Sequence, residues 1–174
     1  MKPKSNFYGA EKAACSSARD EWETPQNLYD ALDEEFHFTL DVCASNDNAK
    51  CRLYFDTEDN GLAQDWGKNI CFMNPPYGKG GVTRRWMQKA YEACINGATV
   101  VCLIPARTDT TWWHDFAMCA DEIRLVKGRV QFTYPGEATS SSTFPSAIVI
   151  FRPDTTCDAP KFSTVNTKGV PLND

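Results

Sequence analysis

The sequence contains no apolar stretch long enough to cross a membrane. No run approaches the ~18 consecutive apolar residues that a membrane-spanning helix needs. The first residues also lack a basic segment followed by an apolar one, which is the pattern of a secretory signal. We therefore expect no membrane partner and no secretion, and we expect the protein to act in the cytoplasm.

Closely paired cysteines are missing and histidines are scarce. The chain has eight cysteines and two histidines, and no two cysteines have the CxxC spacing typical of zinc and redox sites. Cys71 and Cys102 lie inside apolar runs, where a free thiol packs like a small apolar side chain. We expect no metal site, and we predict that the cysteines are free structural thiols in a reducing compartment.

An excess of positive charge is absent as well. The net charge of −5 argues against strong, indiscriminate binding to nucleic acid. One basic face would still be enough for DNA, and two groups of basic residues offer either phosphate contacts or solvated surfaces. The first group is Lys79, Arg84, Arg85 and Lys89, and the second is Arg124, Lys127 and Arg129.

The chain does contain enough apolar residues for one folded domain. It has 174 residues, of which 42% are apolar, and five tryptophans. We predict a flexible arm at residues 1–21, one domain at residues 22–153 and a polar, disordered tail at residues 154–174.

Apolar periodicity predicts alternating helices and strands. A helix is expected to begin at Pro25, with Thr24 as its N-cap, and further helices are expected at residues 82–95 and 109–119. Strands are expected at residues 38–42, 52–55, 70–73, 99–104, 122–126, 130–134 and 147–151. This order predicts an α/β protein with a mostly parallel sheet and an antiparallel edge strand.

The most informative segment is Asn74-Pro75-Pro76-Tyr77. It follows the apolar run 70–73 and precedes the glycine-rich residues 78–81, which predicts a strand that ends in a rigid polar loop. The prolines remove two backbone donors, and the carboxyl end of a strand is where open α/β sheets bind ligands. A planar amine could donate hydrogen bonds to Asn74 Oδ1 and to the Pro75 carbonyl. The alternative is a turn stiffened by proline around a partly buried tyrosine.

This tetrapeptide is the motif of amino-methyltransferases, and the chain resembles DNA adenine N-methyltransferases. The resemblance covers residues 22–151, includes the apolar segment 144–151, and is greatest to the phage-type Dam-like family. It implies a Rossmann-like fold of the class I S-adenosylmethionine-dependent methyltransferases. It also implies methyl transfer to the exocyclic amine of a flipped adenine, in the cytoplasm of a bacterial host if a phage or prophage encodes the chain. Asn74 and Pro75 would hold the amine next to Pro76, and Tyr77 would stack on the base.

The resemblance implies S-adenosylmethionine as the cofactor, although the usual glycine-rich turn after the first strand is missing. No glycine follows the predicted strand 38–42 until Gly61, which argues against a dinucleotide enzyme. An Asp-Val-Cys-Ala-like segment stands at this place in the phage-type family. The residues expected to bind the cofactor are Trp22, Thr24, Pro25, Asp41, Cys43, Ala44, Asp56, Asp65, Trp66 and Asn74.

Each of these acids and aromatics has an expected contact and a structural alternative. Asp41 is expected at the amino-acid end of the cofactor, Asp65 at its adenine amino group, and Thr24-Pro25 beside its carboxylate, where a helix N-terminus favours anions. The ribose acid is one of Asp56, Glu58 and Asp59. The alternatives are a helix-capping acid for Asp41, a solvated acidic loop, core packing for Trp66, and a simple helix cap for Thr24.

Double-stranded DNA is the expected partner. The residues expected to contact it are Lys79, Arg84, Arg85, Arg107, Lys127 and Arg129. Trp112 and Trp113 either line the pocket or cover the sheet. Members of the family often methylate GATC, which the resemblance suggests and no residue demonstrates. The sequence does not indicate an oligomeric state.

Two other functions are compatible with the tetrapeptide. Enzymes that methylate a glutamine amide in release factors or a guanine amine in ribosomal RNA carry it too, usually with a glycine-rich first turn and additional substrate domains that this chain lacks. A DNA-binding relative that has lost its cofactor would also explain the missing glycines. We favour the adenine-specific enzyme, because the resemblance covers most of the chain.

Overall fold

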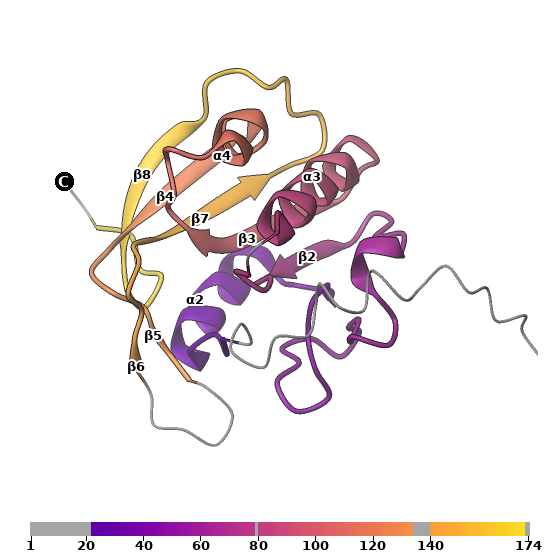
Figure 1. Cartoon of the computed structure of the whole chain (residues 1–174), viewed down its shortest axis with the longest axis horizontal. Helices are drawn as coiled ribbons and strands as arrows, with labels where there is room; N and C mark the ends of the chain where they lie inside the picture. Colours follow the sequence, from indigo (N-terminus) through magenta and orange to yellow (C-terminus); the bar gives the residue numbers. More distant parts are fainter. Residues whose placement is uncertain (1–21, 79, 134–139, 173–174) are drawn as a thin grey trace, which may run out of the picture.

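A computed structural model describes residues 22–78, 80–133 and 140–172 of the chain. The predicted arm at residues 1–21 and Lys79 lie outside these ranges. Within them, a six-stranded sheet has the order β1-β2-β3-β7-β4-β8, and β5 and β6 form a separate pair (Figure 1). The strands are β1 (Leu40–Asp41), β2 (Ile70–Met73), β3 (Thr99–Pro105), β4 (Glu122–Lys127), β5 (Gln131–Phe132), β6 (Ser140–Ser141), β7 (Ser146–Phe151) and β8 (Lys161–Asn166).

The strand directions confirm the predicted α/β class, and they agree with a Rossmann-like methyltransferase fold. β1, β2 and β3 are parallel, β4 and β8 are parallel, and β7 runs antiparallel to both β3 and β4. The sequence predicted an antiparallel strand at the edge of the sheet. The antiparallel strand β7 instead lies inside the sheet, between β3 and β4. Every residue of β7 is buried, which suits an apolar strand with a neighbour on each side.

Helices cover both faces of the sheet. Successive strand residues point to opposite faces, so Cys102 of β3 packs in one core cluster and Leu103 in the other. The first cluster includes the buried face of α3 (Val82–Ile95), and the second includes the buried face of α2 (Gln26–Phe36). Figure 1 shows α3 near α4 (Thr111–Asp115). The first cluster also contains Trp112 and Trp113, which favours their structural role.

The starts of two helices show how local sequence sets the fold. α3 has the predicted bounds, and it follows Gly81, whose φ of 78° is a conformation that favours glycine. α2 begins one residue later than predicted, with Pro25 at its N-cap position and without a side-chain cap. Thr24 is therefore not the N-cap that the sequence suggested.

Several predicted elements are shorter than expected. The first strand is limited to Leu40–Asp41, and residues 52–55 contribute only a bridge between Tyr54 and Asp41. The predicted helix 109–119 divides into α4 and the 3-10 helix η2 (Ala117–Cys119), because the backbone of Phe116 between them is not helical. The predicted strand 130–134 contains β5, which pairs with β6 and not with the main sheet.

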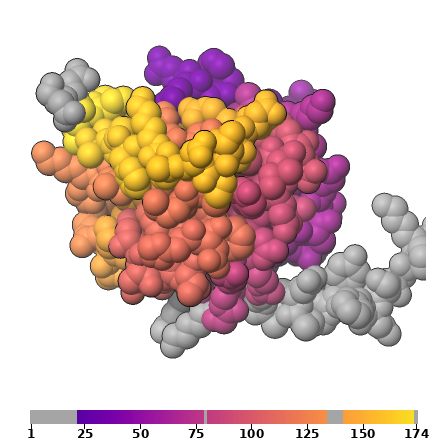
Figure 2. All heavy atoms as spheres, turned by 90° about the horizontal axis from the view of Figure 1, so that it is seen from above, coloured from indigo at the N-terminus to yellow at the C-terminus, as the bar shows by residue number. Residues whose placement is uncertain are grey.

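The prediction of a disordered tail is wrong for residues 161–166. They form β8, which pairs in parallel with β4 along its whole length, from Glu122 opposite Lys161 to Lys127 opposite Asn166. Figure 2 shows this C-terminal part of the chain, in yellow, on the surface. β8 is an edge strand with Val165 as its buried residue, so its sequence has almost no apolar alternation.

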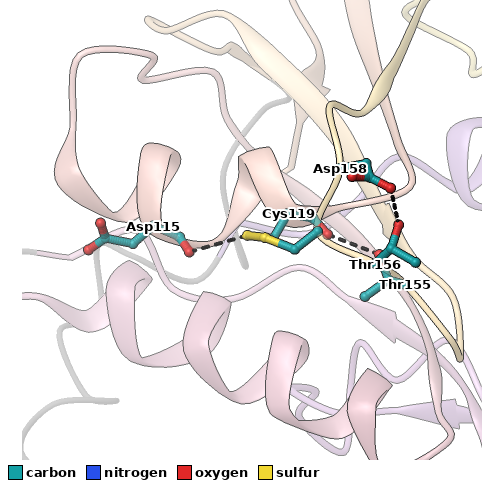
Figure 3. The surroundings of a disulfide bond; sticks show 6 residues. Asp115, Cys119, Thr155, Thr156 and Asp158 are labelled. Carbon is teal, nitrogen blue, oxygen red and sulfur yellow. Dashed lines mark hydrogen bonds between the residues drawn. A yellow bond between two sulfur atoms is a disulfide. The ribbon is translucent and has the colours of Figure 1, made fainter.

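The prediction that all cysteines are free is also wrong. A disulfide joins Cys119, at the end of η2, to Cys157, in the connection between β7 and β8 (Figure 3). Thr155 of the same connection donates a hydrogen bond to the Cys119 carbonyl at 3.1 Å. Among the described residues, the free cysteines are Cys43, Cys51, Cys71, Cys94 and Cys102.

Within the described ranges, every helix is too short or too polar to cross a membrane.

Candidate active site

A pocket opens at the carboxyl ends of β1 and β2. Val42, Cys43 and Ala44 follow β1 and line one side, and Asn74 and Pro76 follow β2 and line another. Its empty space is about 610 Å³, a figure that includes the part open to solvent. The remaining walls come from Trp22, Ser45, Asn48, Phe55, Asp56, Thr57, Asn60, Gly61 and Trp86.

Asn74 is held by hydrogen bonds from both ends of its amide. Its Nδ2 donates to the backbone carbonyl of Trp22 at 2.6 Å and to Thr24 Oγ1 at 2.9 Å. The Tyr77 hydroxyl donates to Asn74 Oδ1. An amide oxygen has two lone pairs, so Oδ1 can accept one more hydrogen bond at the edge of the pocket.

Tyr77 is buried and does not line the pocket. Its ring makes edge contacts with Phe132 and Phe144, with centroids 6.3 Å and 5.4 Å away. Its hydroxyl also lies 3.0 Å from the Leu103 carbonyl of β3. Burial raises the pKa of Tyr77 well above its ordinary value, so the hydroxyl keeps its proton and remains a donor. Here Tyr77 braces Asn74 against β3.

Asp41 is a buried acid at the end of β1. Its carboxylate accepts backbone hydrogen bonds from Cys43 at 3.3 Å and Lys50 at 3.1 Å. Burial raises the pKa of Asp41 to about 6, although these hydrogen bonds and the charge of Lys50 oppose the shift. Asp41 lines a second, smaller pocket beside the first, together with Thr24, Lys50 and Asn74.

The structure brings together most of the residues predicted to bind a cofactor. Cys43, Ala44 and Asp56 line the large pocket, and Thr24 and Asp41 line the small one. Trp22, Cys43 and Asn74 line both. Pro25 occupies the N-cap position of α2 and lines neither.

Asp65 and Trp66 do not reach the pocket. Asp65 is exposed and accepts a hydrogen bond from the Gly67 amide at 2.9 Å, on a separate open surface beside Lys89. Trp66 is buried, and its indole N–H donates to the Gly61 carbonyl at 2.8 Å. The core-packing alternative for Trp66 therefore describes what is observed.

Gly61 is a pocket residue that the sequence did not single out. A Cβ at this position would meet the Val42 carbonyl oxygen at 2.1 Å and the Trp86 ring at 3.1 Å. Glycine therefore lets the loop at residues 55–61 approach the end of β1. The one signal for this in the sequence is that Gly61 is the first glycine after β1.

The predicted DNA-binding residues have different surroundings. Arg107, Lys127 and Arg129 are exposed, and Arg107 follows the carboxyl end of β3. Arg84 forms an ion pair with Asp115 at 2.5 Å and lies over the Phe116 ring. Arg85 is half-buried.

Arg124 from the second basic group has a structural function. It is buried and forms ion pairs with Glu35 of α2 at 2.5 Å and with Glu122 at 2.9 Å. These partners raise the pKa of Arg124. Among the described residues, no group of three or more histidine, cysteine or acidic side chains is arranged to hold a metal ion.

Comparison with known proteins shows the family of the chain. The family model described as DNA N-6-adenine-methyltransferase (Dam) matches residues 12–171. A DNA N-6-adenine-methyltransferase of Haemophilus phage HP1 (strain HP1c1) is 30% identical over 142 residues, which are 79% of this chain and 81% of that protein. A DNA N-6-adenine-methyltransferase of Escherichia phage T1 is 31% identical over 109 residues, which are 62% of this chain and 44% of that protein. The chain therefore belongs to the DNA N-6-adenine-methyltransferase (Dam) family.

Proposed function

We propose that the protein is a site-specific DNA methyltransferase that moves a methyl group from S-adenosylmethionine to the exocyclic amine of adenine. The observation that carries this proposal is the placement of Asn74, which lines both pockets while its amide is held from both ends. The names of the phage relatives support DNA as the substrate and adenine as the base.

The lining of the two pockets supports S-adenosylmethionine as the cofactor. Phe55, Pro76 and Trp86 provide apolar surface for an adenine ring, and Asp56 is close enough in the same pocket to serve a ribose. Asp41 of the small pocket suits an ammonium group, and Lys50 beside it suits a carboxylate. When bound, the cofactor supplies an electrophilic methyl group on a sulfonium.

The protein's own residues then have to orient a weak nucleophile. The adenine amine is weak because its lone pair is delocalised into the ring. Asn74 Oδ1 and the Pro75 carbonyl would accept its two hydrogens and turn the lone pair toward the methyl group. These acceptors also match the positive charge that develops on the nitrogen during transfer. The proton leaves after attack, so a strong base is not required.

DNA binding would place the adenine against this loop. An adenine inside a duplex must be flipped out to reach it. Stacking on Tyr77 requires a rearrangement around its ring, which is buried between Phe132 and Phe144. Arg107, Lys127 and Arg129 are exposed and available for phosphate or base contacts. GATC is the target that we propose from the family.

A methyl-transfer assay on three substrates tests the function. Purified protein is incubated with radiolabelled S-adenosylmethionine and with unmethylated duplex DNA, ribosomal RNA or a release factor. We expect label in the DNA, and cleavage by restriction enzymes sensitive to adenine methylation then locates the site. Label in the RNA or in the release factor instead would overturn the proposal. Calorimetry with S-adenosylhomocysteine identifies a relative without cofactor affinity, because such a protein releases no heat.

A further inference from the structure

The Asn74 amide is oriented by a segment about fifty residues earlier in the chain. Its Nδ2 donates to the Trp22 carbonyl at 2.6 Å and to Thr24 Oγ1 at 2.9 Å. We propose that Thr24 and the Trp22 carbonyl are positioning groups for Asn74. The carbonyl can only accept, so it determines that Asn74 presents its oxygen and not its nitrogen to the target amine, and the Thr24 hydroxyl holds the amide in that place. This inference rests on the proposed function of Asn74 as the acceptor for that amine.

The orientation follows from which groups can donate. An asparagine side chain has a donor end and an acceptor end of nearly equal shape, and the surrounding hydrogen bonds decide which end points where. If the Asn74 amide were turned over, its Oδ1 would lie against the Trp22 carbonyl, and two acceptors would be in contact. The Thr24 and Tyr77 hydroxyls could adapt to either orientation, since a hydroxyl both donates and accepts. The Trp22 carbonyl is therefore the partner that decides, and only the observed orientation gives it a donor.

The Thr24 hydroxyl can accept the hydrogen bond from Asn74 because it does not cap α2. α2 has no side-chain cap at its N-terminus, and Pro25 takes the N-cap position. Thr24 itself is 5% exposed. Glu23 fixes the segment from the other side, since its backbone N–H and C=O pair with Thr133 at 2.9 Å and 3.3 Å. Thr24 is thus held in place for Asn74, whereas the sequence suggested a helix cap or a contact with the cofactor's carboxylate.

The same contacts explain why this chain needs asparagine at position 74. An aspartate at this position would keep the acceptor oxygen. Here an ionised carboxylate would put a second oxygen against the Trp22 carbonyl, in a part-buried position where such repulsion is poorly screened. Asn74→Asp should therefore be active only in its protonated form, in which the introduced carboxyl can donate to that carbonyl.

Two substitutions of Thr24 separate positioning from cofactor binding. Thr24→Val removes the hydroxyl but keeps the shape, and Thr24→Ser keeps the hydroxyl. We expect Thr24→Val to lower the single-turnover methylation rate about fivefold to tenfold, the effect of one lost hydrogen bond. Its affinity for S-adenosylhomocysteine should stay unchanged, and Thr24→Ser should restore the rate. A weaker affinity at an unchanged rate would overturn the inference in favour of direct cofactor contact.

The pH profile of Asn74→Asp provides a second measurement. Glu23, Asp41 and Lys50 line the small pocket beside Asn74, and the Tyr77 hydroxyl faces its oxygen. Their own titration affects the wild type as well, so the rate of the variant is divided by that of the wild type at each pH. We expect this ratio to rise as the pH falls. A flat ratio near one would contradict the proposed orientation.

A spectroscopic measurement tests the inference even if the wild type transfers no methyl group to DNA. The side-chain amide protons of Asn74 are assigned by nuclear magnetic resonance in the wild type, Thr24→Val and Thr24→Ser. We expect one of them to shift in Thr24→Val and to return in Thr24→Ser. An unchanged spectrum in folded Thr24→Val would refute the contact with Thr24. An inactive wild type that shows the expected shift would refute only the proposed function.

Discussion

At the scale of single residues, the site depends on how a few side chains are held. Asn74 contacts Trp22, Thr24 and Tyr77, and Tyr77 in turn reaches Leu103 of β3. Such linked hydrogen bonds rigidify a polar group that would otherwise sample several rotamers. The site is therefore preorganised before any substrate is present, which is how acceptors contribute most to a transition state.

Replacement of Asn74 should remove most of the turnover and leave cofactor binding intact. We expect Asn74→Ala to lower the methylation rate by about 10²–10³-fold, as for other lost contacts to a developing charge. Calorimetry should show an unchanged affinity for S-adenosylhomocysteine. Asn69→Ala is the matched control, because Asn69 stands just before the opposite end of β2. A rate in Asn74→Ala close to that of the wild type would exclude the mechanism.

The buried carboxyl of Asp41 should make stability depend on pH. Its pKa rises from the ordinary value of 3.8 to about 6 on folding. Below about pH 4 the carboxyl is protonated in both states, and between about pH 4 and pH 6 only the unfolded state loses its proton. The folded protein thus loses stability as the pH rises through this window, by about 3 kcal/mol in all.

Denaturation of Asp41→Asn checks this prediction. The variant carries no charge at position 41, while every other titrating group is shared with the wild type. The unfolding free energy of the wild type minus that of the variant should therefore decrease between about pH 4 and pH 7. A difference that does not change with pH would show that Asp41 is solvated.

The sequence predicts the identity of site residues better than the direction of their side chains. The tetrapeptide at residues 74–77 identifies Asn74 and Pro76, which line the pocket. It does not show that Tyr77 turns inward, because that depends on Phe132 and Phe144 from distant segments. The sequence also does not show that Asp65 lies on a separate exposed surface and not in the pocket.

At the scale of elements, the loop at residues 55–61 shapes one wall of the pocket. Gly61→Ala would place a methyl group against the Val42 carbonyl, a backbone atom that cannot move aside without β1. We expect a loss of about 1–3 kcal/mol in stability, the usual cost of overpacking. Affinity for S-adenosylhomocysteine should fall about tenfold, the equivalent of about 1.4 kcal/mol.

An exposed neighbour of Gly61 provides the control for this substitution. Ala63 is exposed in the same 3-10 helix, η1 (Gly61–Ala63), so Ala63→Ser should change neither property. Equal behaviour of the two variants would show that the close approach of this loop to β1 is not needed.

β8 should contribute to stability although its sequence is polar. Val165→Asp buries a carboxylate without a partner at a position that pairs with β4, and we expect it to lower the unfolding free energy by about 3 kcal/mol. Thr164→Asp, at the exposed neighbouring position, should change it by less than about 0.5 kcal/mol. Denaturation in urea measures both. Similar values for the two variants would mean that β8 does not pack.

Elements with strong apolar periodicity are the ones that sequence predicts well. α3 has the predicted bounds, and β2, β3 and β7 are close to theirs. β8 escaped prediction because an edge strand needs few apolar residues. The strand predicted at residues 130–134 contains β5, but local pattern does not show its pairing with β6 or its separation from the main sheet.

At the scale of the whole molecule, the pocket and an exposed arginine lie at the same end of the parallel strands. The pocket lies at the carboxyl ends of β1 and β2. Arg107 follows the carboxyl end of the parallel strand β3, so it stands at the same edge of the sheet. A net charge of −5 is compatible with binding to DNA, because only the end of the sheet that holds the pocket has to attract phosphate.

Removal of Arg107 should weaken DNA binding in a salt-dependent way. We expect Arg107→Ala to lower affinity for duplex DNA and to reduce the slope of log affinity against log salt concentration by about one. Lys161→Ala is the control, since Lys161 is exposed at the amino end of β8, at the opposite edge of the sheet. Titration at several salt concentrations measures the slopes. Equal slopes for both variants would place the DNA elsewhere.

The contact between Trp22 and Asn74 has a consequence for any shortened version of the protein. A chain that starts at Gln26 would keep α2, the sheet and most of both core clusters, and we expect it to fold. It would nevertheless lack the Trp22 carbonyl and the Thr24 hydroxyl, which accept hydrogen bonds from Asn74. Trimming the front of the chain for crystallisation or tagging would therefore yield a folded sample in which we expect methyl transfer to be much slower.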